Sequence, residues 1–217
     1  MLAAFSSSPS AFRSAVPASS TRLLPSGPPR PQVVALQGTL RLQLPIAQQM
    51  VTAVGYHAAS AAALPLEPLG RQANEGLFSR IFHKLFGGGG KGLAWYQLGG
   101  GAGSSTGAVD VGAPAGTDVY APLNGTIVAI QDYVVDGKPY GNVIDIEPAG
   151  SPNVVVALSH VRVDPSLAVG APLAAGSSKV GTVLDFSGVE RQALARHTQD
   201  AGNHVTLAVQ PAATLSS

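Results

Sequence analysis

The sequence predicts an all-β core, built as an antiparallel β-sheet or sandwich, in the second half of the chain. From Trp95 onward, short runs rich in β-branched residues are separated by turns that contain Gly, Pro and Asn. The chain holds 26 Gly and 17 Pro among 217 residues, a content that favours turns over long helices. A clear helical period occurs in one segment, residues 74–86. Together these observations favour the all-β class.

Composition divides the chain into three parts. Residues 1–32 are rich in Ser, Ala and Pro and are predicted to be a disordered N-terminal arm without a clear signal peptide. Residues 33–92 contain short β-branched runs, the helical segment and a Gly-rich linker that begins at Gly87. Residues 93–217 form the predicted β domain. The sequence leaves open whether residues 33–86 fold onto that domain.

The segment 74–86 has the pattern of a short amphipathic helix. Its Leu, Ile and Phe residues recur at helical spacing, Asn74 is a suitable N-cap, and the glycine run that begins at Gly87 ends it. One interpretation is that the apolar face packs on the β domain. The other is a peripheral contact with a membrane surface or a partner protein.

Six strands are predicted in the β domain, each a β-branched or alternating run bounded by turn residues. They cover residues 118–122, 125–135, 141–149, 153–163, 180–186 and 203–209. Residues 187–202 interrupt this series with a charged, irregular segment, in which we expect a helical turn.

Composition also excludes several classes of site. The chain has no Cys, so it has no disulfide, no thiolate metal site and no Cys nucleophile. Residues 1–100 carry eight Lys and Arg against two acids, a charge of +6, and residues 101–217 carry five against ten, a charge of −5. Neither half shows the dense basic stripe of a nucleic-acid binder. No run of about 18 apolar residues predicts a transmembrane span.

Three polar residues stand out against their apolar surroundings. Asp110 lies in the run Val109–Val111, His160 lies late in the predicted strand 153–163, and His204 begins the last strand. A carboxylate in an apolar run needs a partner, because an unpaired buried charge costs several kcal/mol. Asp110 either accepts hydrogen bonds from a nearby turn, such as that of Thr117, or belongs to a site.

The segments around these residues resemble the lysostaphin/LytM-type zinc metallopeptidases of bacterial cell walls. The resemblance rests on "TGAVDVGAPAGTDVYAP" (106–122), "ALSHV" (157–161) and "GNHVTLAV" (202–209), supported by "YGNVIDIEP" and "LAVGAPLAAGSSKVGTV". It covers about residues 104–212, half of the chain. It implies a LytM-like fold of the duplicated hybrid-motif type.

The resemblance also implies roles for individual residues. Asp110 matches the family's aspartate zinc ligand, and His160 and His204 match the two histidines that act beside the metal-bound water. The other two ligand positions, which are histidines in the family, fall on Thr106 and Thr206. A hydrolytic zinc usually needs three protein ligands, and a threonine hydroxyl is a poor one. We therefore expect zinc to be absent or weakly bound. The alternative is a rearranged metal site formed by Asp110, His160 and His204.

The function expected from this resemblance is a catalytically degenerate domain that binds cell-wall peptidoglycan or regulates a cell-wall enzyme. One alternative is an active zinc endopeptidase that cleaves peptidoglycan cross-links with an atypical metal site. Another is a structural or interaction module of the barrel-sandwich type, although no lipoyl-lysine turn occurs in the chain. The resemblance implies a cell-envelope or secreted location. If it holds, the side chains of Asp110, His160 and His204 should converge on one point.

Overall fold

The computed structural model describes residues 27–74, 93–189 and 191–212. In these residues the chain is built from β-strands, with two short 3₁₀-helices, η1 (Gln48–Met50) and η2 (Ala193–Arg196). The predicted all-β class is therefore confirmed, and η2 is the helical turn expected within residues 187–202. No helix in this part of the chain is long and apolar enough to cross a membrane. Most of the predicted arm, and the predicted helix beyond Asn74, lie outside the described residues.

The six strands predicted in the β domain are all observed, with bounds that differ by at most three residues, and the structure adds three others, at residues 94–97, 108–112 and 172–173. The β domain contains β6 (Ala94–Gln97), β7 (Ala108–Gly112), β8 (Asp118–Tyr120), β9 (Gly125–Val135), β10 (Lys138–Pro148), β11 (Val154–Val163), β12 (Pro172–Leu173), β13 (Lys179–Val183) and β14 (His204–Pro211). The segment before it contributes β1 (Val33–Gln37), β2 (Leu40–Gln43), β3 (Val54–His57), β4 (Glu67–Pro68) and β5 (Arg71–Gln72).

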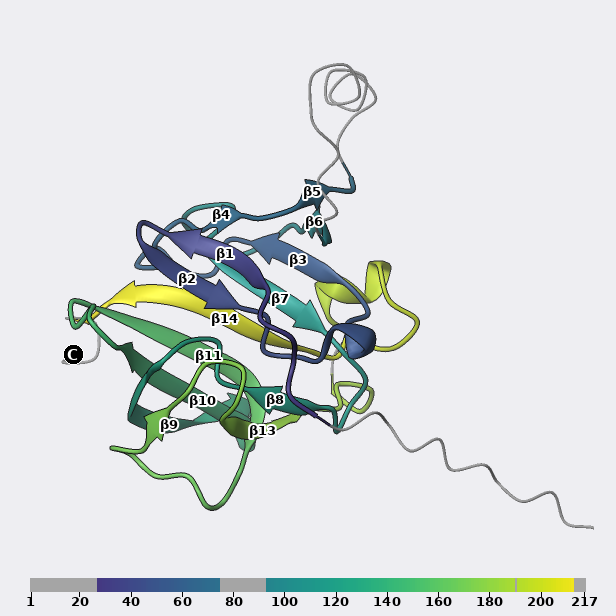
Figure 1. The fold of residues 1–217 in the computed structure, drawn as a ribbon. Helices are drawn as coiled ribbons and strands as arrows, with labels where there is room; N and C mark the ends of the chain where they lie inside the picture. The colour runs from purple at the N-terminus through teal and green to yellow at the C-terminus, as the bar shows by residue number, and fades with distance from the viewer. Residues whose placement is uncertain (1–26, 75–92, 190, 213–217) are drawn as a thin grey trace, which may run out of the picture.

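The strands form a small sheet and a large one. The small sheet has the order β2-β1-β4. The large sheet has the order β12-β9-β10-β11-β14-β7-β3-β6-β5, and β13 branches from β11 to pair with β8. Its pairs are antiparallel except β3–β6 and β5–β6. In Figure 1, the yellow β14 lies between the green β11 and the teal β7, which places these three strands at the centre of the sheet.

The two faces of the central strands differ in chemistry. Val109, Val111, Val205 and Leu207 are fully buried in the main hydrophobic core, which also contains residues of β1, β2 and β13. Because side chains alternate along a strand, the residues between them face the other side of the sheet. That face carries Asp110 and its neighbours, so the polar residues and the core use opposite sides of the same strands.

The segment before the β domain packs onto it, which answers the question that the sequence left open. Strand β3 pairs antiparallel with β7, so a strand of residues 33–92 extends the large sheet. Leu42 and Ile46 are fully buried in the same core as the β-domain valines. The hydroxyl of Tyr56 donates a hydrogen bond of 2.7 Å to the carbonyl of Val34 and links β3 to β1.

Candidate functional site

Asp110 lies at the centre of the candidate site, on β7 between β3 and β14. Its cross-strand neighbours are Gly55 of β3 and Thr206 of β14. No larger residue fits at position 55 without movement, because a Cβ atom there would lie 2.5 Å from Cδ1 of Leu98. Asp110 is only 4% exposed, so its carboxylate depends on protein partners for the polar contacts that water would supply.

Three side chains approach the same oxygen, Oδ1 of Asp110. The hydroxyl of Thr206 donates a hydrogen bond of 2.7 Å, and Nε2 of His57 lies at 3.0 Å. Nε2 of His204 lies at 3.6 Å, which is ion-pair distance rather than a hydrogen bond. The partners come from β3 and β14, the two strands that flank β7. The residues that enclose the carboxylate are distant in sequence, and they meet because β3 and β14 both pair with β7.

The contacts of His57 fix its protonation. Its Nδ1 lies 2.9 Å from the carbonyl oxygen of Ala58, and its Nε2 faces the carboxylate of Asp110. Both partners only accept hydrogen bonds when Asp110 is ionised, so both ring nitrogens carry protons. The hydrogen bond with Asp110 accordingly raises the pKa of His57 to about 9, although partial burial acts against it. His57 and Asp110 form a charged pair between the N-terminal segment and the β domain.

His160 joins the site through Thr206. Nδ1 of His160 lies 3.0 Å from the Thr206 hydroxyl. Since that hydroxyl gives its proton to Asp110, Nδ1 of His160 must be the donor in this contact. His160 has φ of 63°, in the left-handed region, next to an irregularity in the pairing of β10 with β11. A non-glycine residue persists in this region only where the surrounding structure offsets its strain. Such residues cluster at functional sites.

Aromatic side chains cover the histidines. Phe186 stacks on His204 with ring centroids 5.4 Å apart, and it meets His160 edge-on at 5.3 Å. Tyr133 meets the same imidazole edge-on at 4.6 Å. His204 is only 2% exposed, and its Nδ1 is held 2.6 Å from the carbonyl oxygen of Gly202. The site is therefore closed over His204 and opens to solvent beside His57, whose side chain is 24% exposed.

Burial and charge separate the ionisation of the remaining groups. Burial alone would raise the pKa of Asp110, but the charges of His204 and His57 and the Thr206 hydrogen bond outweigh it, so the pKa lies well below its usual range. Burial and the nearby charge of His204 lower the pKa of His160 to about 3. At neutral pH the site thus holds an anionic Asp110, a cationic His57 and a neutral His160.

The structure brings together most of the residues singled out in the sequence. Asp110, His204 and Thr206 are in direct contact, and the imidazole rings of His160 and His204 have centroids 4.6 Å apart. Thr106 does not join them. It lies in the turn before β7, where its hydroxyl faces that of Ser104 and its carbonyl accepts a hydrogen bond from the amide of Leu66. The hydroxyl of Thr106 therefore takes no part in the hydrogen bonds of Asp110.

Sequence reasoning missed one residue of the site. His57 follows Tyr56 in a segment without a recognised motif, and nothing local marks it as a partner of Asp110. The missing signal is the register of β3 on β7, which pairs Gly55 with Asp110. His197, the histidine of the irregular segment 187–202, stacks on Tyr96 with ring centroids 3.8 Å apart. Thr117 also makes its hydrogen bond elsewhere, to the carbonyl of Pro114.

The residues present do not fit the zinc that the sequence resemblance implies. Of the three positions to which the resemblance assigns ligands, only Asp110 carries a good metal-binding group. Thr206 donates a hydrogen bond to the carboxylate oxygen that would face the metal, and Thr106 lies outside the cluster. Within residues 27–74, 93–189 and 191–212, no three or more His, Cys, Asp or Glu side chains form a group that could hold a metal ion.

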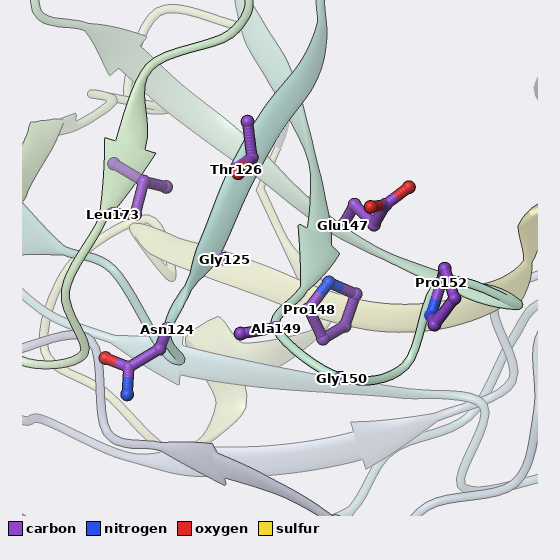
Figure 2. Close-up of a pocket in the computed structure, with 9 residues that line it drawn as sticks. All are labelled: Asn124, Gly125, Thr126, Glu147, Pro148, Ala149, Gly150, Pro152 and Leu173. Carbon is purple, nitrogen blue, oxygen red and sulfur yellow. The ribbon is translucent and has the colours of Figure 1, made fainter.

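A separate surface depression of about 460 Å³ lies at the ends of β9 and β10 (Figure 2). It is lined by Asn124, Gly125, Thr126, Glu147, Pro148, Ala149, Gly150, Pro152 and Leu173. Glu147 is its single ionisable residue, and no member of the Asp110 cluster reaches it. The depression lacks the converging polar groups expected of a site for chemistry. The Asp110 cluster therefore remains the better candidate.

No protein-family model matches the sequence, and no curated protein matches it either. Several solved structures are similar in fold. A deep-sea M23 metalloprotease, pseudoalterin, is 14% identical, with 81% of this chain and 73% of that chain covered and a TM-score of 0.40. Lysostaphin is 20% identical over 48% of this chain and 36% of its own, with a TM-score of 0.34.

Csd3 of Helicobacter pylori is 17% identical, with a TM-score of 0.34. The match covers 48% of this chain but only 23% of Csd3, so the chain spans a small part of that protein. Lysostaphin is thus among the solved structures to which this chain is similar. At these identities and TM-scores, the function has to be inferred from the geometry of the site.

Proposed function

We propose that this chain is a peptidase-fold domain that binds bacterial cell-wall peptide without hydrolysing it. The observation that carries the proposal is the hydrogen bond of 2.7 Å from Thr206 to Asp110. This contact occupies the carboxylate at the place where the zinc enzymes of the resembled family need a third ligand. Without a bound metal, the domain lacks a group that would activate water, because a hydrolytic zinc lowers the pKa of its bound water to about 7.

The contacts of His160 and His204 support the same proposal. His204 is covered by Phe186, and its Nδ1 is hydrogen-bonded to the carbonyl oxygen of Gly202. His160 is hydrogen-bonded to the hydroxyl of Thr206. A general acid or base must come within hydrogen-bond reach of its substrate. Both histidines instead serve a closed network that stabilises Asp110. The sequence resemblance supplies the ligand class, peptidoglycan peptide, and with it a location in the cell envelope or outside the cell.

The polar face of the sheet offers a place for such a peptide. Ala157 and Ser159 of β11 lie on this face and are partly exposed, whereas Ala208 of β14 and Ala108 of β7 on the same face are buried. The accessible part of this face is therefore the β11 side. The small side chains there would let an extended peptide lie close to the strand.

Sedimentation with purified peptidoglycan sacculi, followed by mass spectrometry of the soluble fraction, tests the proposal. We expect the full chain to sediment with sacculi and to release no peptide fragments, with or without added zinc. The variant Ala157→Arg should sediment less, whereas Val169→Arg, at a site 61% exposed in the turn before β12, should behave like wild type. Fragment release would support the zinc endopeptidase alternative instead. No sedimentation of the wild-type chain would overturn the binding proposal.

A further inference from the structure

We infer that His57 occupies the metal-ligand position that the family resemblance assigns to Thr106, so the site is one zinc ligand short rather than two. This inference concerns the residues around Asp110 and goes beyond the proposed function. It holds whether or not the domain binds cell-wall peptide. The first support is position: Nε2 of His57 lies 3.0 Å from Oδ1 of Asp110, whereas Thr106 is engaged with Ser104 and Leu66.

The distance suits two donors on one metal ion. With bonds of about 2.0–2.1 Å, neighbouring ligand atoms of a tetrahedral zinc lie about 3.3–3.5 Å apart. The His57 nitrogen and the Asp110 oxygen are slightly closer than this, because a hydrogen bond now joins them. Loss of the proton on Nε2, together with a separation of a few tenths of an ångström, would convert the pair into two ligands. The open side of the site, next to His57, is where an ion would enter.

The orientation of the imidazole is also that of a ligand. A histidine that binds metal usually donates its other ring N–H to a carboxylate or a backbone carbonyl, which fixes the ring and leaves one nitrogen for the metal. In His57, Nδ1 faces the carbonyl oxygen of Ala58 at 2.9 Å, and Nε2 faces the site. The end of β3 therefore presents Nε2 in a fixed direction.

The local sequence explains how position 57 reaches the site. The strand register opposes Gly55 to Asp110 and His57 to Ala108, so the His57 side chain lies on the polar face two residues from the carboxylate. The absence of a side chain on Gly55 lets Leu98 pack closely against β3. A histidine from a neighbouring strand can thus replace one from the turn that precedes β7.

Zinc titration of restored variants tests this inference directly. Thr206→His returns an imidazole to the third position, and we expect it to bind one equivalent of zinc with His57 and Asp110 as the other ligands. Wild type and Thr106→His should bind no stoichiometric zinc. The double variant His57→Gln with Thr206→His should bind zinc more than about 100-fold more weakly than Thr206→His alone, a larger loss than that from removing a supporting hydrogen bond.

Zinc content by elemental analysis, competition with a chromophoric chelator and the absorption spectrum of bound Co²⁺ give readouts that need no catalytic activity. His57→Gln keeps a hydrogen-bond donor toward Asp110, and circular dichroism and thermal melts check that each variant folds. Zinc binding by Thr206→His that is unaffected by His57→Gln would overturn the inference. So would zinc binding that appears only when Thr106→His and Thr206→His are combined. One equivalent of zinc in wild type would show that the site is not short of a ligand.

Discussion

Nε2 of His57 lies 3.0 Å from Oδ1 of Asp110, and this contact joins the N-terminal segment to the central strand of the β domain. The carboxylate is buried, so removal of the imidazole leaves an anion with fewer partners. Loss of one partner of a buried pair costs about 3–5 kcal/mol, and the partial exposure of His57 reduces this to about 2–3 kcal/mol. We expect His57→Ala to lower the free energy of unfolding by that amount in urea titrations at pH 7.

His197→Ala is a matched control for this prediction. His197 is also a partly exposed histidine with an aromatic neighbour, Tyr96, but it contacts no carboxylate among the described residues. We expect its loss to cost less than about 1 kcal/mol. Equal effects of the two substitutions would show that the His57–Asp110 pair contributes nothing special to stability.

The pair also predicts how stability varies with pH. The folded pKa of His57, about 9, lies above the unfolded value of 6.5, so its contribution is complete below pH 6.5 and is lost between pH 6.5 and 9. The folded pKa of His160, about 3, lies below the same reference, so stability falls as pH drops from 6.5 toward 3. The lowered pKa of Asp110 adds a loss of stability below about pH 4. We expect a maximum of stability near pH 6.5.

Substitutions of His57 and His160 separate the loss of stability above pH 6.5 from the loss below it. In urea titrations from pH 4 to 9, His57→Gln should remove most of the decline above pH 6.5, and His160→Gln should reduce the decline below it. The shift of the His57 pKa from 6.5 to about 9 sets an upper limit of roughly 3.5 kcal/mol on the first effect, since each pKa unit corresponds to about 1.4 kcal/mol. A decline above pH 6.5 that persists in His57→Gln would assign it to another group.

The backbone of His160 gives a prediction that is independent of its imidazole. At φ of 63° an L-residue costs about 1–2 kcal/mol, whereas glycine adopts this conformation freely. His160→Gly and His160→Ala both remove the ring, so their difference reports the backbone. We expect the Gly variant to be more stable by about 1 kcal/mol in urea titrations.

The neighbouring residue Ser159 provides the comparison. Ser159 lies within β11, and its φ is not positive. There Ser159→Gly should be less stable than Ser159→Ala, as in an ordinary strand. The same order of stability at both positions would contradict a strained backbone at His160.

The extent to which the sequence predicted this molecule follows from the range of the interactions. The strands β8 to β11, β13 and β14 were predictable because alternation and turn residues are local, and the bounds predicted for β9 match those observed. The two-residue strand β12 was not predicted, because it is too short to show alternation. The meeting of Asp110, His160, His204 and Thr206 followed from motif order. The His57 contact depends on the register between β3 and β7, which are separated by about 50 residues and share no local signal. Thr106 was misplaced for the converse reason, since adjacency in sequence to β7 did not bring its side chain into the site.

The hydroxyl of Thr206 should be the most sensitive atom of the network. It donates to Asp110 at 2.7 Å and accepts from Nδ1 of His160 at 3.0 Å, and Thr206 is itself only 7% exposed. Thr206→Val keeps the shape but removes both contacts, and leaves a buried charged group and a buried imidazole N–H each short of a partner. Hydrogen bonds to charged groups contribute about 1.5–3 kcal/mol, and an unsatisfied buried donor adds to the cost.

We therefore expect Thr206→Val to lower the free energy of unfolding at pH 7 by about 2–4 kcal/mol, measured by urea titration. Thr206→Ser retains the hydroxyl and loses one methyl group, so it should cost about 1 kcal/mol or less through packing alone. The ratio of the two effects isolates the hydroxyl. If Val and Ser were equally destabilising, the methyl group rather than the hydrogen-bonded chain from His160 to Asp110 would account for the role of Thr206.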